Sequence, residues 1–283
     1  MPKQTLVRAA RAEDKDAIVA FCQNTFSWGD YIADVWERWL ADPKGQLLVG
    51  VVDDQPVSLM HVALHGALAW LEGMRVHPDF RRQGIARLVE AEGRAWAHAR
   101  GCRVACLATS IKNVAAQAML DAIGYRRAAQ FNEWEIEPAP DDFSFARIAA
   151  ENDWARASAL WDASESCAAS HSIIPNRHWH WTPLDETRWR EHLRAGEVRF
   201  APNGLALLLA SEERDWIGML LIALAGDEET MYALARAARG EAAYRGYPRL
   251  EGQLADCPTA NRALERAGFQ RGGGMFIYEI ELR

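Results

Sequence analysis

A basic, glycine-containing loop between a strand pattern and a helix pattern constrains this chain more than any other feature. The loop reads Arg81-Arg82-Gln83-Gly84-Ile85-Ala86, and it joins an apolar run at 67–76 to helical spacing at 85–99. Glycine lets the backbone approach a ligand closely, and successive N–H groups entering a helix attract an anion at the positive end of the helix dipole. The pattern predicts a pyrophosphate site, although a capped surface helix behind a basic turn has the same pattern.

The first half of the chain predicts a sheet with helices packed on it. Helical spacing covers 14–26 and resumes after Gly29-Asp30 with a clean apolar stripe. Strand-like runs at 46–53, 56–65 and 67–76 are separated by short turn signals, so antiparallel neighbours are expected. The helix at 85–99 is expected to bury this stripe: Ile85, Leu88, Val89, Ala95, Trp96 and Ala99.

A second group of elements completes this half. A strand is predicted at 104–109, followed by a helix at 114–123 with Asn113 as its N-cap and Gly124 as its C-terminal cap. A strand follows at 130–137. Pro138-Ala139-Pro140-Asp141-Asp142 then reads as a short, rigid linker.

The second half repeats the order of the first. It predicts strands at 143–148, 198–201, 204–210, 216–224, 250–254 and 275–282, and helices at 152–163, 187–195, 230–245 and 261–267. A repetition on this scale indicates a duplicated domain rather than a solenoid. The expected domains are residues 1–138 and 143–283, a division that suits a chain of 283 residues.

Composition excludes several classes of function. The net charge of -7 disfavours nucleic acid and anionic membranes as partners, because both need a cationic face. No long apolar span or basic leader is present, so a cytoplasmic protein is expected. The expected oligomeric state is a monomer or homodimer. The five cysteines are scattered without a CxxC pair, and Cys102 and Cys106 read as core residues. No metal is expected, because the histidines at 171, 178 and 180 lack spaced acidic or cysteine partners.

The run from Leu71 to Ala86, together with Asn113 to Tyr125, resembles the GNAT superfamily of acyl-CoA-dependent N-acetyltransferases. That family combines a strand ending in Val-x-Pro, an R/Q-x-x-G-x-G/A loop and an Asn-led helix ending in Gly-Phe or Gly-Tyr. The resemblance covers about residues 5–137 and is traceable at 143–283. It implies an α/β (α+β) fold of two tandem GNAT-like domains, each a mixed, mainly antiparallel sheet flanked by helices.

The resemblance also implies how acetyl-CoA, the acyl donor, is held. The backbone of Met74, Arg75 and Val76 would pair with the pantetheine arm where the strand splays from its neighbour. The amides of Gln83, Gly84, Ile85 and Ala86, with the side chains of Arg81 and Arg82, would hold the pyrophosphate. Asn113 would lie near the thiol end, a role compatible with a plain helix cap.

Attack of an amine on a thioester needs a base to remove the ammonium proton. Glu72 is the candidate base, because it precedes the cofactor-binding residues on the same strand; a solvated strand glutamate is the alternative. Many family members place a tyrosine four residues before the Gly-Phe/Tyr pair, as acid for the leaving thiolate. Here that position is Leu120, so the thiolate leaves unaided or another group, such as Tyr31 or Tyr125, serves.

Three segments together loosely resemble the histidine N-acetyltransferase-like group: Trp28-Gly29-Asp30-Tyr31, Trp39-Leu40-x-Asp42-Pro43 and Leu71-Glu72-Gly73-x-Arg75-Val76. This resemblance implies a free amino acid or another small-molecule amine as acceptor, with Trp28, Asp30 and Tyr31 lining its pocket. Helix capping by Asp30 and core packing by the aromatic residues explain the same pattern.

The second half lacks the phosphate loop. Three carboxylates, at Asp227, Glu228 and Glu229, stand where phosphates would bind, and their charges repel an anion. The N-terminal half is therefore expected to be the catalytic domain and the C-terminal half a degenerate one. A non-catalytic acyl-CoA-binding or regulatory protein, and an enzyme acting on a protein or peptide N-terminus or lysine, are the alternatives.

Overall fold

The structure is a computed structural model that describes residues 5–23, 25, 29–176, 180–213 and 216–283. The chain forms two compact units. Unit 1 comprises Met1–Leu107, Met119–Arg126 and Glu279–Arg283, and unit 2 comprises Ala108–Ala118 and Arg127–Tyr278. The units follow packing, whereas the sequence domains 1–138 and 143–283 follow the repeated element order, so the latter boundaries stay a prediction.

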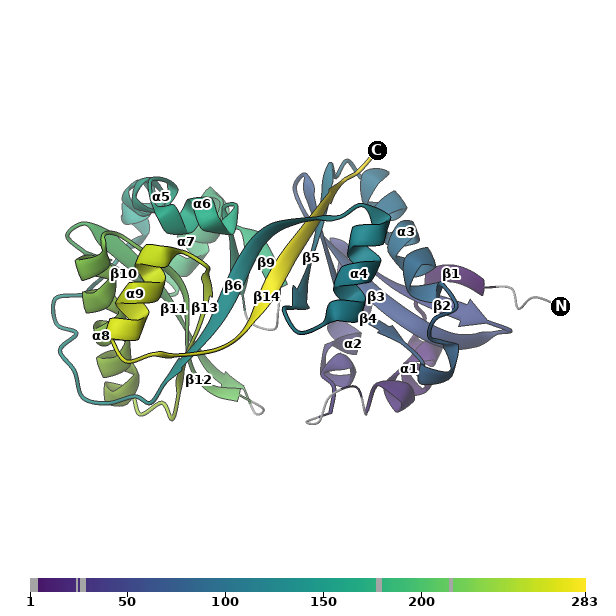
Figure 1. The fold of residues 1–283 in the computed structure, drawn as a ribbon, viewed down its shortest axis with the longest axis horizontal. Coiled ribbons are helices and arrows are strands. Elements are labelled where there is room, and N and C mark those ends of the chain that lie inside the picture. Colours follow the sequence, from purple (N-terminus) through teal and green to yellow (C-terminus); the bar gives the residue numbers. More distant parts are fainter. Residues whose placement is uncertain (1–4, 24, 26–28, 177–179, 214–215) are drawn as a thin grey trace. The chain divides into compact units, whose positions relative to one another are not determined.

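Unit 1 is built on a sheet with helices on both faces (Figure 1). The strand order is β1(Thr5–Ala9), β2(Gly45–Val52), β3(Gln55–His65), β4(Leu68–Val76) and β5(Val104–Ser110). The first three pairs are antiparallel, and β4–β5 is parallel. The helices α1(Lys15–Cys22) and α2(Ile32–Leu40) pack on one face, and α3(Ile85–His98) packs on the other. A 3-10 turn, η1(Ala12–Asp14), precedes α1, and another, η2(Pro78–Phe80), precedes the phosphate-loop candidate.

Alternation along the strands separates the two cores of unit 1. In β2, Leu47, Val49 and Val51 pack beneath α1 and α2, whereas Leu48 and Val52 pack beneath α3. The predicted stripe of α2 is buried as expected, and so are Cys102 and Cys106. Side chains that are two residues apart on a strand share a face, and the same alternation determines which core each side chain of β4 faces.

The stripe predicted for α3 is partly wrong. Leu88 is 46% exposed, and Ala95 and Ala99 are also exposed. The buried face instead follows Ile85, Val89, Gly93 and Ala97. At Gly93 a side chain would meet the Cε atom of Met60 at 2.3 Å, so the helix approaches the sheet most closely where it has no side chain. A stripe of apolar residues could not reveal that contact.

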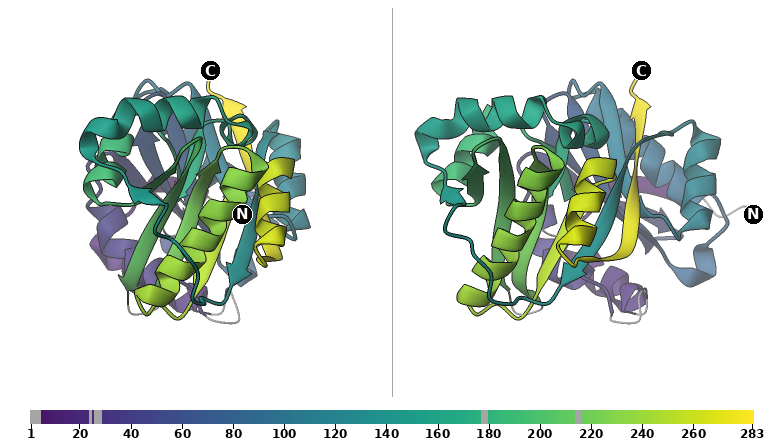
Figure 2. Two further views of the ribbon diagram at one scale, coloured as in Figure 1. Left: turned by 90° about the vertical axis from the view of Figure 1, so that its left-hand side faces the viewer. Right: turned by 60° about the vertical axis from the view of Figure 1, so that its left-hand side comes forward.

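Unit 2 has a larger sheet of the same kind, with helices on both faces (Figure 2). Its strand order is β14(Gln270–Glu281), β6(Arg126–Ile136), β13(Leu250–Ala255), β12(Trp216–Ala225), β11(Gly204–Glu213), β10(Val198–Ala201) and β7(Arg147–Ile148). The helices α8(Glu228–Tyr244) and α9(Pro258–Arg266) lie side by side on one face, and α5(Trp154–Asp162) and α7(Glu186–Arg194) cover the other.

Shorter elements complete unit 2. They are η3(Glu151–Asp153), α6(Glu165–Ser170) and a two-stranded ladder of β8(Ile173–Asn176) with β9(His180–Pro183). The sequence did not predict α6 or this ladder. It also predicted a longer β7 and a later start for α9, which begins at Pro258 because proline suits the first turn of a helix. The helix α4(Val114–Ile123) is divided between the units: its first residues belong to unit 2 and its last residues to unit 1.

The two units repeat one motif. In unit 1, β4, α3 and the parallel strand β5 follow one another; in unit 2, β12, α8 and the parallel strand β13 do the same. The predicted fold class is confirmed: a mixed, mainly antiparallel α/β architecture in tandem. Within the described residues, no helix is long and apolar enough to cross a membrane.

Candidate active site

A bulge in β4 sets the direction of the predicted catalytic strand. Glu72 pairs with His61 of β3, and Arg75 pairs with Leu59, so three steps along β4 oppose two along β3. Gly73 occupies the left-handed region at this point, with φ +72°. Such a bulge inserts one residue and bends the strand away from regular pairing. As a result, Glu72 and Arg75 share a face although they are three positions apart on the strand.

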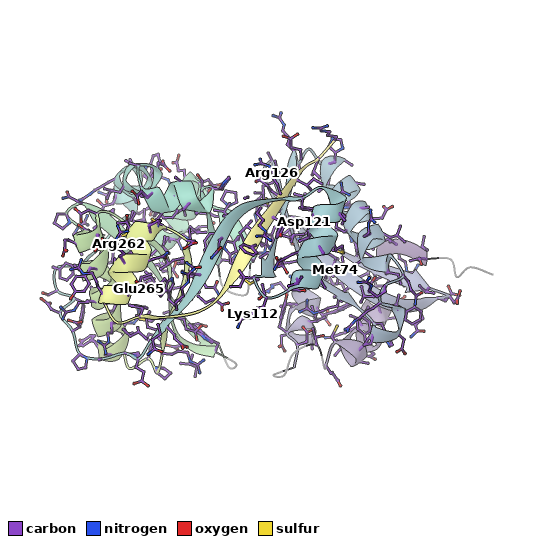
Figure 3. The ribbon with its side chains drawn as sticks, in the orientation of Figure 1. Met74, Lys112, Asp121, Arg126, Arg262 and Glu265 are labelled. Atoms are coloured by element: carbon purple, nitrogen blue, oxygen red, sulfur yellow. The ribbon has the colours of Figure 1, made fainter. Side chains whose placement is uncertain are left out.

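That shared face is the one covered by α1 and α2. Leu71 and Met74 contribute to the core beneath α3, so the side chains of Glu72 and Arg75 lie on the opposite face (Figure 3 labels Met74). Trp39 of α2 closes this face over the bulge, because a side chain at Gly73 would meet its ring at 2.5 Å. Glycine at this position is thus required both by the backbone and by the tryptophan.

The backbone of β4 loses its parallel partner just before the bulge. In the part of the chain that the structure describes, the ladder between β4 and β5 ends at the pair Trp70–Cys106. Beyond it, the carbonyl oxygen of Met74 accepts a hydrogen bond from Arg75 Nη1 at 3.2 Å, and that of Val76 accepts one from Arg81 Nε at 3.2 Å. The strand segment assigned to the pantetheine arm is therefore not engaged in a ladder with β5.

The loop after η2 has the conformation expected for an anion site. Arg82 and Gly84 both have left-handed backbones, with φ 64° and φ 81°. Gly84 is the N-cap of α3 and offers no side chain to the N–H groups of the first turn. Alternating left-handed residues turn successive N–H groups toward one point, and the helix dipole adds positive potential there. This geometry fits the pyrophosphate role predicted from the sequence.

The side chains of this loop differ in their exposure. Arg81, Arg82 and Gln83 are exposed, whereas Ile85 is buried in the core beneath α3 and anchors the helix start. A Cβ atom built on Gly84 would have no heavy atom within 4 Å, so the space beside the loop is open. Ala86 is half-buried and adds no bulk.

Two of the predicted acceptor residues lie beside the bulge. Arg75 forms a two-point ion pair with Asp30, at 2.8 Å from Nε and 3.2 Å from Nη2. Asp30 also accepts a hydrogen bond from the N–H of Ile32 at 3.3 Å and so helps to begin α2. The guanidinium of Arg75 lies 5.3 Å from the centre of the Tyr31 ring. Asp30 thus fills the capping role as well as pairing with Arg75.

The pKa of the Tyr31 phenol reflects the charged groups on this face. Burial raises the pKa of its phenol, and the carboxylates of Glu72 and Asp30 raise it further, while Arg75 opposes them. These groups act on one phenol because α2 begins directly above the bulge of β4. The structure therefore brings together Glu72, Asp30 and Tyr31, three of the residues predicted from the sequence.

Two further site residues were predicted from the sequence, Trp28 and Asn113. Trp28 lies outside the described residues. Asn113 belongs to unit 2, where its side-chain oxygen accepts a hydrogen bond from the N–H of Ala116 at 3.1 Å and caps α4. The predicted cap is confirmed, and its role near the thiol stays a prediction.

Sequence reasoning missed the residue that contacts Glu72. His61 is buried, and its Nδ1 atom lies 2.9 Å from Oε1 of Glu72. Its Nε2 atom lies 3.2 Å from Oδ2 of Asp42, and its ring stacks on Trp39 with centroids 4.9 Å apart. Neither His61 nor Asp42 was predicted from the sequence as a site residue.

The candidates for the acid that protonates the thiolate differ in their surroundings. Leu120 is buried at the usual tyrosine position. The hydroxyl of Tyr125 donates to Oε1 of Glu90 at 2.6 Å, and burial followed by the charge of Glu90 raises the pKa of that phenol strongly. A phenol committed to a buried carboxylate is a poor proton donor, which leaves Tyr31 as the better placed of the two tyrosines.

The corresponding helix start in unit 2 is occupied by its own side chains. Asp227 caps α8 by accepting from the N–H of Thr230 at 2.7 Å. Glu228 pairs with Arg262 at 2.7 Å and Arg266 pairs with Glu229 at 2.8 Å, both arginines coming from α9 (Figure 3 labels Arg262). The predicted carboxylates therefore stand at the start of α8, where Asp227 caps the helix and Glu228 and Glu229 form ion pairs.

No arrangement of three or more His, Cys, Asp or Glu side chains suited to a metal ion occurs within the described ranges. His178 lies outside these ranges. The absence of a metal cofactor stays a prediction.

Comparison with known families and structures agrees with this geometry. The sequence model of the acetyltransferase (GNAT) family matches residues 12–125. These residues include the bulge, the loop at 81–86 and α4. No curated protein sequence matches the chain significantly.

Solved structures match the whole chain. A GCN5-related N-acetyltransferase from Sphaerobacter thermophilus is 17% identical with a TM-score of 0.69, over 100% of this chain and 97% of that one. A tandem GNAT protein from the clavulanic acid biosynthesis pathway is 16% identical with a TM-score of 0.62, over 99% of each chain. A GCN5-related N-acetyltransferase from Kribbella flavida is 15% identical with a TM-score of 0.58, over 99% of this chain and 72% of that one.

At these identities the structures establish the fold alone, and the family match adds the class of reaction for its own segment. The chain therefore has the GNAT fold over its full length, residues 12–125 match the acetyltransferase family, and these findings together support an acyltransferase.

Proposed function

We propose that the protein transfers an acetyl group from acetyl-CoA to the primary amine of a small molecule, by direct attack in a ternary complex. One observation carries the proposal: the bulge at Gly73 lies where β4 has left its ladder with β5 and turns Glu72 to the face that holds Asp30 and Tyr31. A strand without its neighbour can pair with an extended cofactor, and the carboxylate beside it is placed to act on the acceptor.

The cofactor would lie along β4 and the loop that precedes α3. The backbone of Met74, Arg75 and Val76 would bind the pantetheine arm, and the loop at 81–86 would bind the pyrophosphate. Asn113 would lie near the thiol. Acetyl-CoA supplies the thioester, and this chain's residues orient it by hydrogen bonds and charge.

The proposed chemistry places one proton on Glu72. The acceptor enters as an ammonium, and Glu72 removes a proton to give the neutral amine. A C–N bond then forms at the thioester carbonyl while the C–S bond breaks. The nitrogen releases its second proton as it becomes the amide, and this proton replaces the one that the departing thiolate of CoA takes up. Tyr31 is proposed as a candidate donor of the proton to the thiolate.

A small acceptor fits the burial of these groups better than a protein does. Only 8% of the Glu72 side chain and 2% of the Asp30 side chain are exposed. A slender amine reaches such carboxylates more readily than the surface of a folded protein. The loose resemblance to the histidine N-acetyltransferase-like group supports a free amino acid or a similar amine, bound near Trp28, Asp30 and Tyr31.

We propose residues 1–138 as the catalytic domain and residues 143–283 as a degenerate GNAT-like domain. The ion pairs that hold Glu228 and Glu229 at the start of α8 support this division. An anion arriving there would meet carboxylates rather than open N–H groups. One acetyl-CoA per chain is the expected stoichiometry.

The test is a screen for acetyl-CoA turnover against amino acids, polyamines, aminoglycosides and peptides, with acetyl-CoA binding measured in parallel. Turnover with a small amine is the expected result. Binding without turnover on any amine would indicate a non-catalytic acyl-CoA-binding protein. Turnover confined to peptides would indicate a protein N-acetyltransferase.

A further inference from the structure

His61 is a buried side chain that links the proposed base to a second carboxylate. It lies opposite Glu72 in the antiparallel pair of β3 and β4. Only 2% of its side chain is exposed, compared with 8% for Glu72 and 24% for Asp42. Because water has little access to a histidine so placed, its ring nitrogens depend on protein groups for their partners.

The two nitrogens of His61 are not equally satisfied. Nδ1 has a hydrogen-bond partner in Glu72 at 2.9 Å. Nε2 lies 3.2 Å from Asp42, within ion-pair distance, yet no described residue makes a hydrogen bond of good angle with it. His61 therefore forms a hydrogen bond with Glu72. The carboxylate of Asp42 acts on the ring mainly through its charge.

Further contacts hold the His61 ring and its neighbour Asp42. Trp39 stacks on it almost in parallel, with an interplanar angle of 6°. Asp42 is itself held by the N–H of Lys44, which donates to its Oδ1 atom at 2.9 Å. At Gly45 a side chain would lie 2.2 Å from Oδ2 of Asp42 and 2.6 Å from Nε2 of His61, so glycine keeps that approach open.

We infer that His61 is a positioning residue that fixes the carboxylate of Glu72, and that Asp42 acts through His61. A base must be held at one orientation to meet the acceptor's proton, and a buried donor on a rigid ring supplies that restraint. The inference rests on the proposed function, since it assigns His61 and Asp42 to the base of that same site.

The first experiment separates a positioning role from a packing role. Asp42→Asn removes a charge that is partly exposed and leaves the fold intact. It should lower kcat about tenfold, with little change in KM for acetyl-CoA, if Asp42 acts through His61. Glu37→Gln on α2, which removes an exposed carboxylate paired with Lys15, is the control and should leave kcat unchanged. An unchanged kcat in Asp42→Asn would overturn the role of Asp42.

The second experiment tests His61 itself. His61→Leu removes the donor with little loss of apolar volume and should lower kcat by more than His61→Gln, which keeps an N–H that can donate. His192→Gln in unit 2 is the control, because His192 has a similar contact with Glu197 at 2.7 Å. Equal kcat values for wild type and a folded His61→Leu variant would overturn the inference.

A double variant separates this inference from the proposed function. Adding Asp42→Asn to Glu72→Gln should lower kcat no further, because Asp42 acts only through Glu72. Two losses that multiply would overturn the inference while leaving Glu72 as the base. If Glu72→Gln alone has wild-type kcat, the proposed base is wrong and the positioning role is lost with it.

Discussion

Asp30 and Arg75 form a two-point ion pair across 45 residues of sequence, joining the start of α2 to the strand just past the bulge. Only 2% of the Asp30 side chain and 14% of the Arg75 side chain are exposed. The pair holds the acceptor-side helix against the cofactor-side strand, so it links the two halves of the proposed site within unit 1.

Breaking this pair should destabilise unit 1. Asp30→Ala removes one partner of a buried, two-point ion pair, a change that typically costs about 3–5 kcal/mol. Urea unfolding, followed by tryptophan fluorescence, measures the change. Glu37→Ala, also on α2, removes a surface ion pair and should change the free energy of unfolding little. Equal stabilities for the two variants would show that the Asp30–Arg75 pair contributes nothing beyond a surface pair.

Glu72→Gln should lower kcat about 100-fold at neutral pH, because the amide cannot take the ammonium proton. KM for acetyl-CoA should change little, since the predicted cofactor contacts come from other residues. Steady-state kinetics with saturating acceptor checks this. Glu92→Gln, an exposed position on α3, is the control. A kcat within twofold of wild type in Glu72→Gln would rule out Glu72 as the base.

Gly73→Ala should destabilise the protein more than Gly66→Ala does. Both glycines have left-handed backbones, with φ 72° and φ 61°. At Gly66 a new Cβ has no atom within 4 Å, so only backbone strain of about 1 kcal/mol is expected. At Gly73 it also meets the Trp39 ring at 2.5 Å, and overpacking brings the total to about 3 kcal/mol. Thermal unfolding of both variants, compared with wild type, measures the difference; equal losses would mean that Trp39 does not restrain the bulge.

The buried thiols predict how stability depends on pH at the alkaline end. Burial raises the pKa of Cys22 and of Cys106 to about 12. A raised folded-state pKa means that the unfolded chain releases its proton first. Stability from these thiols is therefore complete below the unfolded pKa of about 8.5 and is lost as pH rises toward 12.

Replacing the thiols checks that dependence. In the variant Cys22→Ala/Cys106→Ala, the fall in unfolding free energy between pH 8 and pH 10 should be smaller than in wild type. The native protein should also resist thiol reagents at pH 8 at these two positions, and both should react in denaturant. An identical slope in wild type and variant would contradict the assignment.

Much of this fold could be predicted from the sequence because its elements have strong, regular patterns. The three antiparallel strands, the stripe of α2 and the cap at Asn113 all depend on local chemistry. The stripe of α3 could not be placed correctly, because the closest approach to the sheet is made by Gly93, which no count of apolar residues marks.

The site could be predicted in part for the same reason. Glu72, Asp30 and Tyr31 were found by motif and strand position. His61 was missed, although a signal existed: a two-residue turn at Gly66 and Ala67 pairs His65 with Leu68, and counting back along the strands places His61 opposite Glu72. The bulge at Gly73 could not be derived this way, since counting along a regular ladder does not reveal where an extra residue is inserted.

Binding of acetyl-CoA tests the central claim most directly. Isothermal titration of wild type, Gly84→Glu and Gly101→Glu compares two glycines with similar backbones, φ 81° and φ 90°, and with no atom within 4 Å of a new Cβ. Only the first begins α3 at the predicted pyrophosphate site. Wild type and Gly101→Glu should bind one acetyl-CoA per chain with similar affinity, and Gly84→Glu should bind none. Wild-type affinity in Gly84→Glu would contradict the assignment of this loop.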